Sequence, residues 1–311
     1  MTVDPEGGNW TPEQIAQGSA TEIEAGRLPL RAQWRIREQR ARRDRGEPGS
    51  FTSDLTVEEF AAIRSVGFSP VGQVLGSAVF QVGWSYTGCG YYYGGFGSYG
   101  PALAPVVPVP ATQQLLSQAR HRAVQRMTQE CEGLGGDGVV GVRLSVRSFY
   151  GNGLEFMAIG TAVRADGDKR PGRPFTSDLT GQDFARLIRA GWVPAALVQG
   201  VGAVIRHDDF ATRSQRMSWT NQELVGPTQL LHAARDAARA SLAADARDRG
   251  GHTVLLRDMQ VQTFRLRCTS GTEGEDDLAD VFLWGTAVVP FETSASLEAP
   301  LPMLRLSEGT R

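Results

Sequence analysis

The chain has 311 residues, of which 41% are hydrophobic and 21% are charged, and its formal net charge is −2. At this length a single hydrophobic core has usually stopped growing, so we expect two compact domains. The small net charge gives no overall attraction to nucleic acid or to a membrane surface. No stretch approaches the roughly 20 apolar residues that a membrane-spanning helix needs.

Cysteine usage and the N-terminus both favour a cytoplasmic protein. The three cysteines (Cys89, Cys131 and Cys268) are far apart and show no CxxC spacing, which is typical of a reducing compartment. The first residues include acidic groups and no apolar run, so we expect no signal peptide.

Residues 1–49 form an N-terminal extension with two predicted helices. Thr11, followed by a proline, predicts the start of a short helix. The segment Arg31–Arg45 carries seven arginines together with Trp34 and Ile36. A basic amphipathic helix can bind nucleic acid or an anionic membrane, but its apolar face is narrow here. We therefore expect a solvated helix, and any contact of that kind would be made through this segment.

The strongest feature of the sequence is an internal repeat. Residues 51–56 read Phe-Thr-Ser-Asp-Leu-Thr, and residues 175–180 read the same. The similarity continues in order through a glycine, a proline, a Leu-Leu pair and a Gly-Gly pair. Each stretch then closes on Gly-Thr-Ala-Val, at 160–163 and 285–288. Ordered self-similarity of this kind predicts two tandem modules with one fold.

Each module predicts the same series of elements. In the first module, Thr56 and Glu59 form a capping box for a short helix that ends at Gly67. A strand rich in valine and glycine follows, and then a long amphipathic helix and a hairpin with an Asn-Gly turn. These later elements are expected at 71–82, 112–132 and 139–163 in the first module, and at 195–205, 228–248 and 254–289 in the second.

We therefore predict an α+β fold, with a small antiparallel sheet, one long helix and one short helix in each module. A sheet with a helix on one face needs cover on its other face, and we expect the sister module or another subunit to supply it. The predicted boundaries are 1–49 for the extension, 50–165 for the first module, 166–173 for the linker, 174–290 for the second module and 291–311 for a tail.

The turn after the long helix carries a family resemblance. The run Leu134–Val142 reads Leu-Gly-Gly-Asp-Gly-Val-Val-Gly-Val and leads to the closing Gly-Thr-Ala-Val. It resembles the signature of the YbjQ-like family, whose members are uncharacterised. In the second module, Gly250–Leu256 keeps the shape but has His252 in place of Asp137. The resemblance implies two tandem dodecin-like modules, and assembly of such modules into a pentameric ring.

Tandem fusion constrains that ring, because chains of two modules cannot fill a five-fold ring with whole chains. Two stacked five-fold rings, one for each module, would solve this, and so would one pseudo-symmetric ring with an even number of modules. The sequence interpretation favours the stacked rings. The expected partner is the chain itself, as a homo-oligomer.

The family also carries a heavy-metal-binding label, so the resemblance implies a divalent heavy metal as the cofactor to test. The candidate ligands are Asp137, Cys131 and His252, because carboxylate, thiolate and imidazole groups bind such metals. In the alternative, Asp137 binds backbone groups at the turn and Cys131 is a small buried hydrophobe. Residues 207–209 (His-Asp-Asp) have no counterpart in the first module, and we expect them in a solvated loop.

Residues 87–100 interleave glycine with aromatic residues. They include no basic residue and no phosphate-binding pattern. We expect their aromatic side chains to pack at a subunit interface. A disordered loop and a stacking surface for a ligand are the alternatives. The predicted interface residues are Tyr91, Tyr92, Tyr93, Phe96 and Tyr99.

The sequence contains no nucleophile elbow, dinucleotide fingerprint or metalloprotease helix. We therefore expect a non-enzymatic protein that forms a homo-oligomeric ring and serves in assembly or in binding an unidentified ligand. The alternative hypothesis is a heavy-metal-binding or metal-responsive protein.

Overall fold

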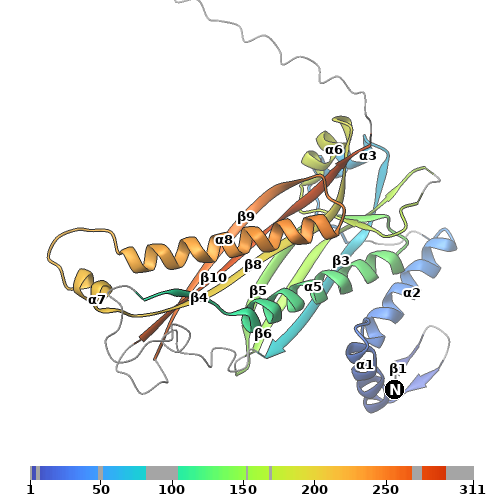
Figure 1. Cartoon of the computed structure of the whole chain (residues 1–311). Coiled ribbons are helices and arrows are strands. Elements are labelled where there is room, and N and C mark those ends of the chain that lie inside the picture. Colours follow the sequence, from blue (N-terminus) through green and yellow to red (C-terminus); the bar gives the residue numbers. More distant parts are fainter. Residues whose placement is uncertain are drawn as a thin grey trace, which may run out of the picture.

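The computed structural model describes residues 2–4, 8–47, 52–81, 104–151, 153–167, 170–267 and 275–291. In these residues the chain combines helices with two four-stranded sheets and one two-stranded sheet (Figure 1). The predicted mixture of helix and sheet is confirmed. Among the described residues, no helix combines the length and the apolar character needed to span a bilayer.

The N-terminal extension packs against the rest of the chain. It forms strands β1 (Thr2–Val3) and β2 (Asn9–Trp10) and helices α1 (Pro12–Glu24) and α2 (Leu30–Asp44). Helix α1 begins after Thr11, as predicted, and the structure adds a capping box between Thr11 and Gln14. The expectation of a solvated α2 is wrong in part, because Trp34 and Ile36 are buried and Ile36 joins the main core cluster. The arginines leave one apolar face free to pack against α5.

The first predicted module forms its elements in the expected order. The short helix begins at the capping box of Thr56 and Glu59, and Gly67 follows it with a φ of 79°. That left-handed conformation favours glycine and ends the helix. The elements are α3 (Val57–Arg64), β3 (Phe68–Gln81), α5 (Pro110–Gly133), β5 (Gly138–Phe149) and β6 (Gly153–Ala165).

The second predicted module repeats this order. Both sheets also share one strand order, β3-β6-β5 in the first and β8-β10-β9 in the second. Helix α7 (Phe210–Arg216) is an addition without a described counterpart in the first module. The corresponding elements are α6 (Gly181–Arg189), β8 (Trp192–His207), α8 (Val225–Asp248), β9 (Thr253–Arg267) and β10 (Glu275–Pro290).

Each sheet gains a short strand that the sequence interpretation did not predict. β7 (Phe175–Thr176), which opens the second module, pairs parallel with β5 of the first sheet. β4 (Val106–Pro108), which precedes α5 of the first module, pairs antiparallel with β8 of the second sheet. Each module therefore contributes one strand to the sheet of the other.

Each long helix lies close to its own sheet because glycines face it. A Cβ atom on Gly76 of β3 would lie 2.0 Å from the Ala123 carbonyl oxygen of α5. A Cβ atom on Gly200 of β8 would lie 2.1 Å from the Ala238 carbonyl oxygen of α8. Only a residue without a side chain permits backbone contact of this kind. The valine- and glycine-rich strands of the sequence thus set the distance between helix and sheet.

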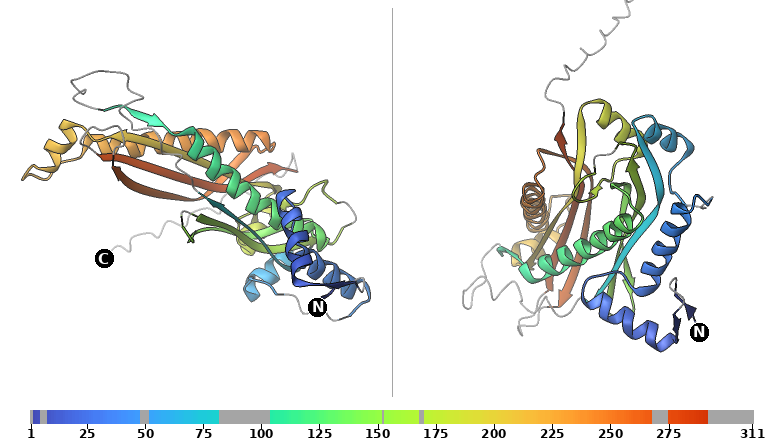
Figure 2. Two further views of the ribbon diagram at one scale, coloured as in Figure 1. Left: turned by 90° about the horizontal axis from the view of Figure 1, so that it is seen from below. Right: turned by 90° about the vertical axis from the view of Figure 1, so that its right-hand side faces the viewer.

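The two modules stack in layers, so that α5 lies between the two sheets. Residues of α5 share one core cluster with the first sheet and with Leu197, Val201, Phe282 and Trp284 of the second. Helix α8 packs on the other face of the second sheet, against a separate cluster that includes Val204. Figure 2 shows the arrangement from two further sides. The first predicted module thus covers the second sheet, which is one of the two kinds of cover that we expected. Among the described residues, no long helix lies on the opposite face of the first sheet.

We predict that Gly76→Ala destabilises the protein, because the added methyl group must displace the backbone of α5. The free energy of unfolding, measured by urea titration, should fall by about 1–3 kcal/mol, the usual cost of overpacking a core. The control is Gly172→Ala in the linker, where a Cβ would meet no atom within 4 Å. Equal stability of the two variants would contradict the described helix-to-sheet contact.

Candidate functional site

The junction between the predicted modules combines strand pairing, an apolar cluster and a buried arginine. The first contact is made by the start of the second module, where β7 and Ser177 pair with β5 of the first sheet. The backbone N–H of Ser177 donates to the carbonyl of Val139 at 2.8 Å, and the N–H of Val142 donates to the carbonyl of Ser177 at 2.9 Å. The Ser177 hydroxyl also lies 3.1 Å from the hydroxyl of Thr286 in the second sheet. The repeated hexapeptide therefore ties the two sheets together.

An apolar cluster surrounds this strand pairing. Phe184 of α6 is fully buried, with ring centroids 5.1 Å from Phe68 and 5.7 Å from Phe175. Val140 of β5 and Ile63 of α3 complete the cluster. Burial of a side chain of this size contributes about 1.5–3 kcal/mol. The cluster therefore holds α3 of one module against α6 of the other.

Helix α5 makes the second contact, through a buried arginine. The Arg120 guanidinium lies 3.9 Å from the ring centre of Phe282 in the second sheet and 5.8 Å from that of Phe156 in the first. Burial lowers the pKa of Arg120 to about 10. The guanidinium is still charged at neutral pH, so it forms cation–π contacts with both sheets.

The carboxylate of Asp245 on α8 contacts both α5 and the edge of the second sheet. Asp245 accepts a hydrogen bond from the Gln199 N–H of β8 at 2.8 Å. Its other oxygen lies 3.4 Å from Nε2 of His121 on α5 and 2.8 Å from Nε of Arg249. Burial alone would raise the pKa of Asp245, but the hydrogen bonds from His121 and Arg249 hold it below its usual value. Asp245 therefore stays charged and satisfies an edge N–H.

Glu130 has the corresponding position on α5. It accepts a hydrogen bond from the Leu75 N–H of β3 at 2.9 Å and pairs with Arg35 of α2 at 2.5 Å. Here burial outweighs the hydrogen bonds, and the pKa of Glu130 is raised. The sequence interpretation missed both acids, although they align at the same offset as the Leu-Leu pairs. The basic side chain that faces the acid comes from α5 in the second module and from α2 in the first.

Residues that are buried at the junction have exposed counterparts on the two outer surfaces of the module pair, one on α3 and one on β9. Phe60 of α3 corresponds to Phe184, yet Phe60 is 40% exposed and Phe184 is 0% exposed. Leu255 of β9 corresponds to Val140 by its sheet register, and their exposures are 40% and 0%. Each of the two surfaces that meet inside the chain thus recurs, uncovered, on the other module.

The predicted metal ligands do not form one site. Cys131 is buried, its thiol donates to the Gly138 carbonyl at 3.3 Å, and burial raises its pKa to about 12. Asp137 accepts hydrogen bonds from the Ala165 N–H at 2.8 Å and from Arg170 at 2.5 Å. The alternative of a small buried thiol is confirmed for Cys131. Asp137 binds backbone as expected, although its partner is at the end of β6.

The third candidate ligand lies in the other module. His252 packs against Trp192, with ring centroids 5.8 Å apart. In the described part of the chain, no three His, Cys, Asp or Glu side chains are grouped so that they could hold a metal ion. The described residues therefore do not fit the metal that the resemblance implies. The predicted aromatic interface residues, Tyr91, Tyr92, Tyr93, Phe96 and Tyr99, lie outside the described residues.

The expectation of a solvated loop at residues 207–209 is wrong. His207, Asp208 and Asp209 are all buried. His207 Nδ1 lies 2.8 Å from a carboxylate oxygen of Asp276, and Arg216 pairs with Asp208 at 3.2 Å. The carboxylate of Asp209 accepts a backbone N–H at the start of α7. Charge pairing with β10 and α7 is what allows these polar residues to be buried.

Known proteins are similar in sequence to parts of this chain. A family model described as "Putative heavy-metal-binding" matches residues 109–166, which contain α5, β5 and β6. The encapsulin nanocompartment protein Rv1762c of Mycobacterium tuberculosis is 31% identical over 255 residues, which cover 79% of this chain and 85% of that protein. The chain therefore belongs to the family of that protein. An alignment of 255 residues is longer than either predicted module, so it draws on both.

Shorter alignments connect the chain with proteins named UPF0145 protein. The one from Halorubrum lacusprofundi is 47% identical over 51 residues, 16% of this chain and 49% of that protein. The one from Thermosipho africanus is 39% identical over 56 residues, 18% of this chain and 52% of that protein. The chain thus aligns with about half the length of these two relatives. None of the three names describes an enzyme.

We predict that the Cys131 thiol is unreactive in the folded protein. With a pKa of about 12, on the order of one thiol in ten thousand is ionised at pH 8, and only the thiolate reacts. In a Cys89→Ser, Cys268→Ser variant, a disulfide reagent should label nothing at pH 8 until guanidinium unfolds the protein. Stability should also fall as the pH rises from 9 to about 12, because only the unfolded thiol loses its proton there. Rapid labelling of the native variant would contradict the described burial.

Proposed function

We propose that the protein is a non-enzymatic assembly protein that joins copies of itself, head to tail, into a closed ring. Its building blocks are two tandem YbjQ-like modules, residues 50–165 and 174–290. One observation carries the proposal: the surface buried between the modules has uncovered counterparts at the two ends of the chain. Such a heterologous interface forms a ring if its rotation closes.

The strand pairing between the modules gives the expected contact between chains. In one chain, residues 175–179 pair with the edge of β5. In the assembly, residues 52–55 of one chain would pair with the edge of β9 in the neighbouring chain, beside Leu255 of that strand. Phe60 of the first chain would then pack near Leu255 as Phe184 packs near Val140. This pairing covers an edge strand that is open in the single chain and is a hazard for aggregation.

The contact inside the chain favours one ring in which the two kinds of module alternate. Stacked five-fold rings, the arrangement favoured by the sequence, would place each module beside modules of its own kind. The structure instead supports the pseudo-symmetric alternative, because a first module packs head to tail on a second. Every closed ring of whole chains then holds an even number of modules.

The comparisons support assembly in a general way. The printed name of the Mycobacterium tuberculosis relative connects that protein with a nanocompartment, and we extend only the assembly role to this chain. Cys131, Asp137 and His252 have separate partners in two modules, so they do not form a common metal site. The described residues thus favour a protein whose surfaces bind other copies of itself.

We predict that one buried charge at either end of the chain prevents assembly. Leu255→Asp and Phe60→Asp should each weaken association at least tenfold, because an unpaired carboxylate in an apolar interface costs several kcal/mol. Multi-angle light scattering at micromolar concentration should then show single chains. Gln229→Glu is the control, since its counterpart on α5, Gln114, stays exposed when that helix is covered. The proposal fails if the unmodified protein is monomeric, or if both variants assemble as it does.

A further inference from the structure

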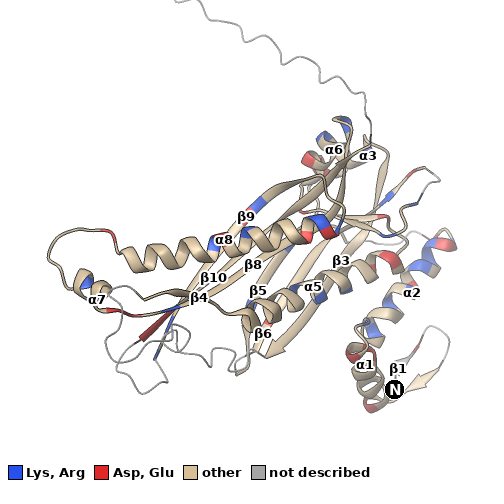
Figure 3. Cartoon of the chain, viewed as in Figure 1, with Lys and Arg blue, Asp and Glu red and all other residues tan. Residues whose placement is uncertain are grey.

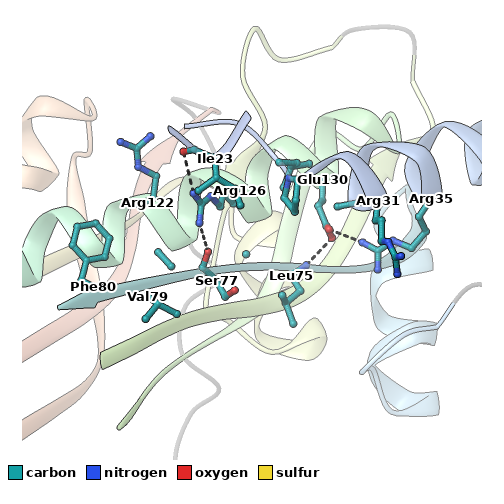
Figure 4. A pocket seen from close by; sticks show the side chains of 15 residues that line it. Ile23, Arg31, Arg35, Leu75, Ser77, Val79, Phe80, Arg122, Arg126 and Glu130 are labelled. Atoms are coloured by element: carbon teal, nitrogen blue, oxygen red, sulfur yellow. Dashed lines mark hydrogen bonds and ion pairs between the residues drawn. The ribbon is translucent and has the colours of Figure 1, made fainter. Parts of the chain in front are cut away.

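A cavity of about 790 Å³ lies where the N-terminal extension meets the first module (Figure 4). Residues 75–80 of β3 form its floor, and α1, α2 and α5 form its walls. Arg126 of α5 donates to the Ser77 carbonyl at 2.6 Å, and Glu130 lies between the Leu75 N–H and Arg35. The cavity combines apolar walls with several guanidinium groups.

The floor of the cavity corresponds to a covered part of the second sheet. Residues 75–80 align with residues 199–204 of β8, all of which are buried. In the second module α5 lies against this stretch, and β4 pairs with its end. Leu75 is 38% exposed, whereas its counterpart Gln199 is 4% exposed. The floor of the cavity is therefore equivalent to part of the surface that α5 covers inside the chain, and it is covered less fully here.

The helix equivalent to α5 is α8, so in a second copy of the chain α8 is the helix that would fit this surface. Helices α5 and α8 have the same length, 24 residues each. Leu116 of α5 is buried at the junction, and its counterpart Leu231 on α8 is half-buried in the single chain. The covered side of α5 thus has an uncovered equivalent on α8.

The charges of this surface differ from those inside the chain. His121 of α5 faces the carboxylate of Asp245, but the counterpart of His121 on α8 is Asp236. Asp236 of the second copy would therefore face Glu130 of the first copy, and two carboxylates repel each other. Helix α2 supplies the missing cations: Arg35 already pairs with Glu130, and Arg31 lines the cavity without an ion pair to any described residue. Figure 3 shows basic residues along much of α2.

We propose that α2 of the N-terminal extension is a docking element, whose Arg31 and Arg35 receive Asp236 of the neighbouring chain's α8. This inference rests on the proposed head-to-tail assembly and adds a partner and a residue pair to it. Asp236 is exposed in the single chain and is paired only with Arg239 of its own helix, at 3.2 Å, among the described residues. That exposed pair contributes little on its own, so Asp236 is free to turn toward α2. The N-terminal extension, which precedes the first module, thereby makes the docking surface of that module different from the corresponding surface of the second.

Charge reversal tests the pairing. Arg31→Glu and Asp236→Arg should each weaken self-association about tenfold, measured by sedimentation velocity at low salt, and the double variant should recover most of the loss. Both residues are exposed, so the variants should unfold at the temperature of the unmodified protein. Arg247→Glu on α8 is the matched control, because its counterpart Glu132 on α5 stays exposed at the junction.

The outcomes separate this inference from the proposed function. If the unmodified protein and both single variants assemble equally well, the docking role of α2 is wrong and the head-to-tail assembly stands. If the single variants are weakened and the double variant is not restored, the residue pair is wrong. If the unmodified protein is monomeric, both the assembly and the docking role are wrong.

Discussion

Each module has one long helix for a sheet with two faces to cover, and this shortage governs the rest of the structure. Helix α5 resolves it for the second sheet, because it is buried on both sides and serves two sheets at once. In the part of the chain that the structure describes, the first sheet has no such second helix, and Leu75 is left half-exposed there. The proposed assembly would cover this apolar surface of one chain with a helix surface of the next.

The edges of the sheets follow the same logic. An open strand edge exposes backbone groups that bind water or another strand. Inside the chain, β4 and β7 cover one edge of each sheet, and the carboxylates of Asp245 and Glu130 satisfy single N–H groups where no strand reaches. The edge of β9 has no such cover in the described residues, and it is the edge that the proposed contact would use.

Much of the fold could be predicted from local sequence signals. The capping boxes at Thr11 and Thr56 and the glycine after each short helix act within a few residues of themselves, and the structure has helices that begin and end there. Strands β4 and β7 are two or three residues long and depend on edges far away in the sequence, so no local pattern marks them. The same reason explains why the Asp245 and Glu130 contacts were missed: their partners are backbone groups of distant strands. The burial of residues 207–209 depends on charges from β10 and α7, which a loop-like sequence does not reveal.

An electron-microscopy reconstruction of the unmodified protein is the most direct test of head-to-tail assembly in a single ring. We expect a closed ring of whole chains in which first and second modules alternate, with α8 of each chain on the β3 side of the next. Single chains, or two stacked rings that each contain one kind of module, would contradict it.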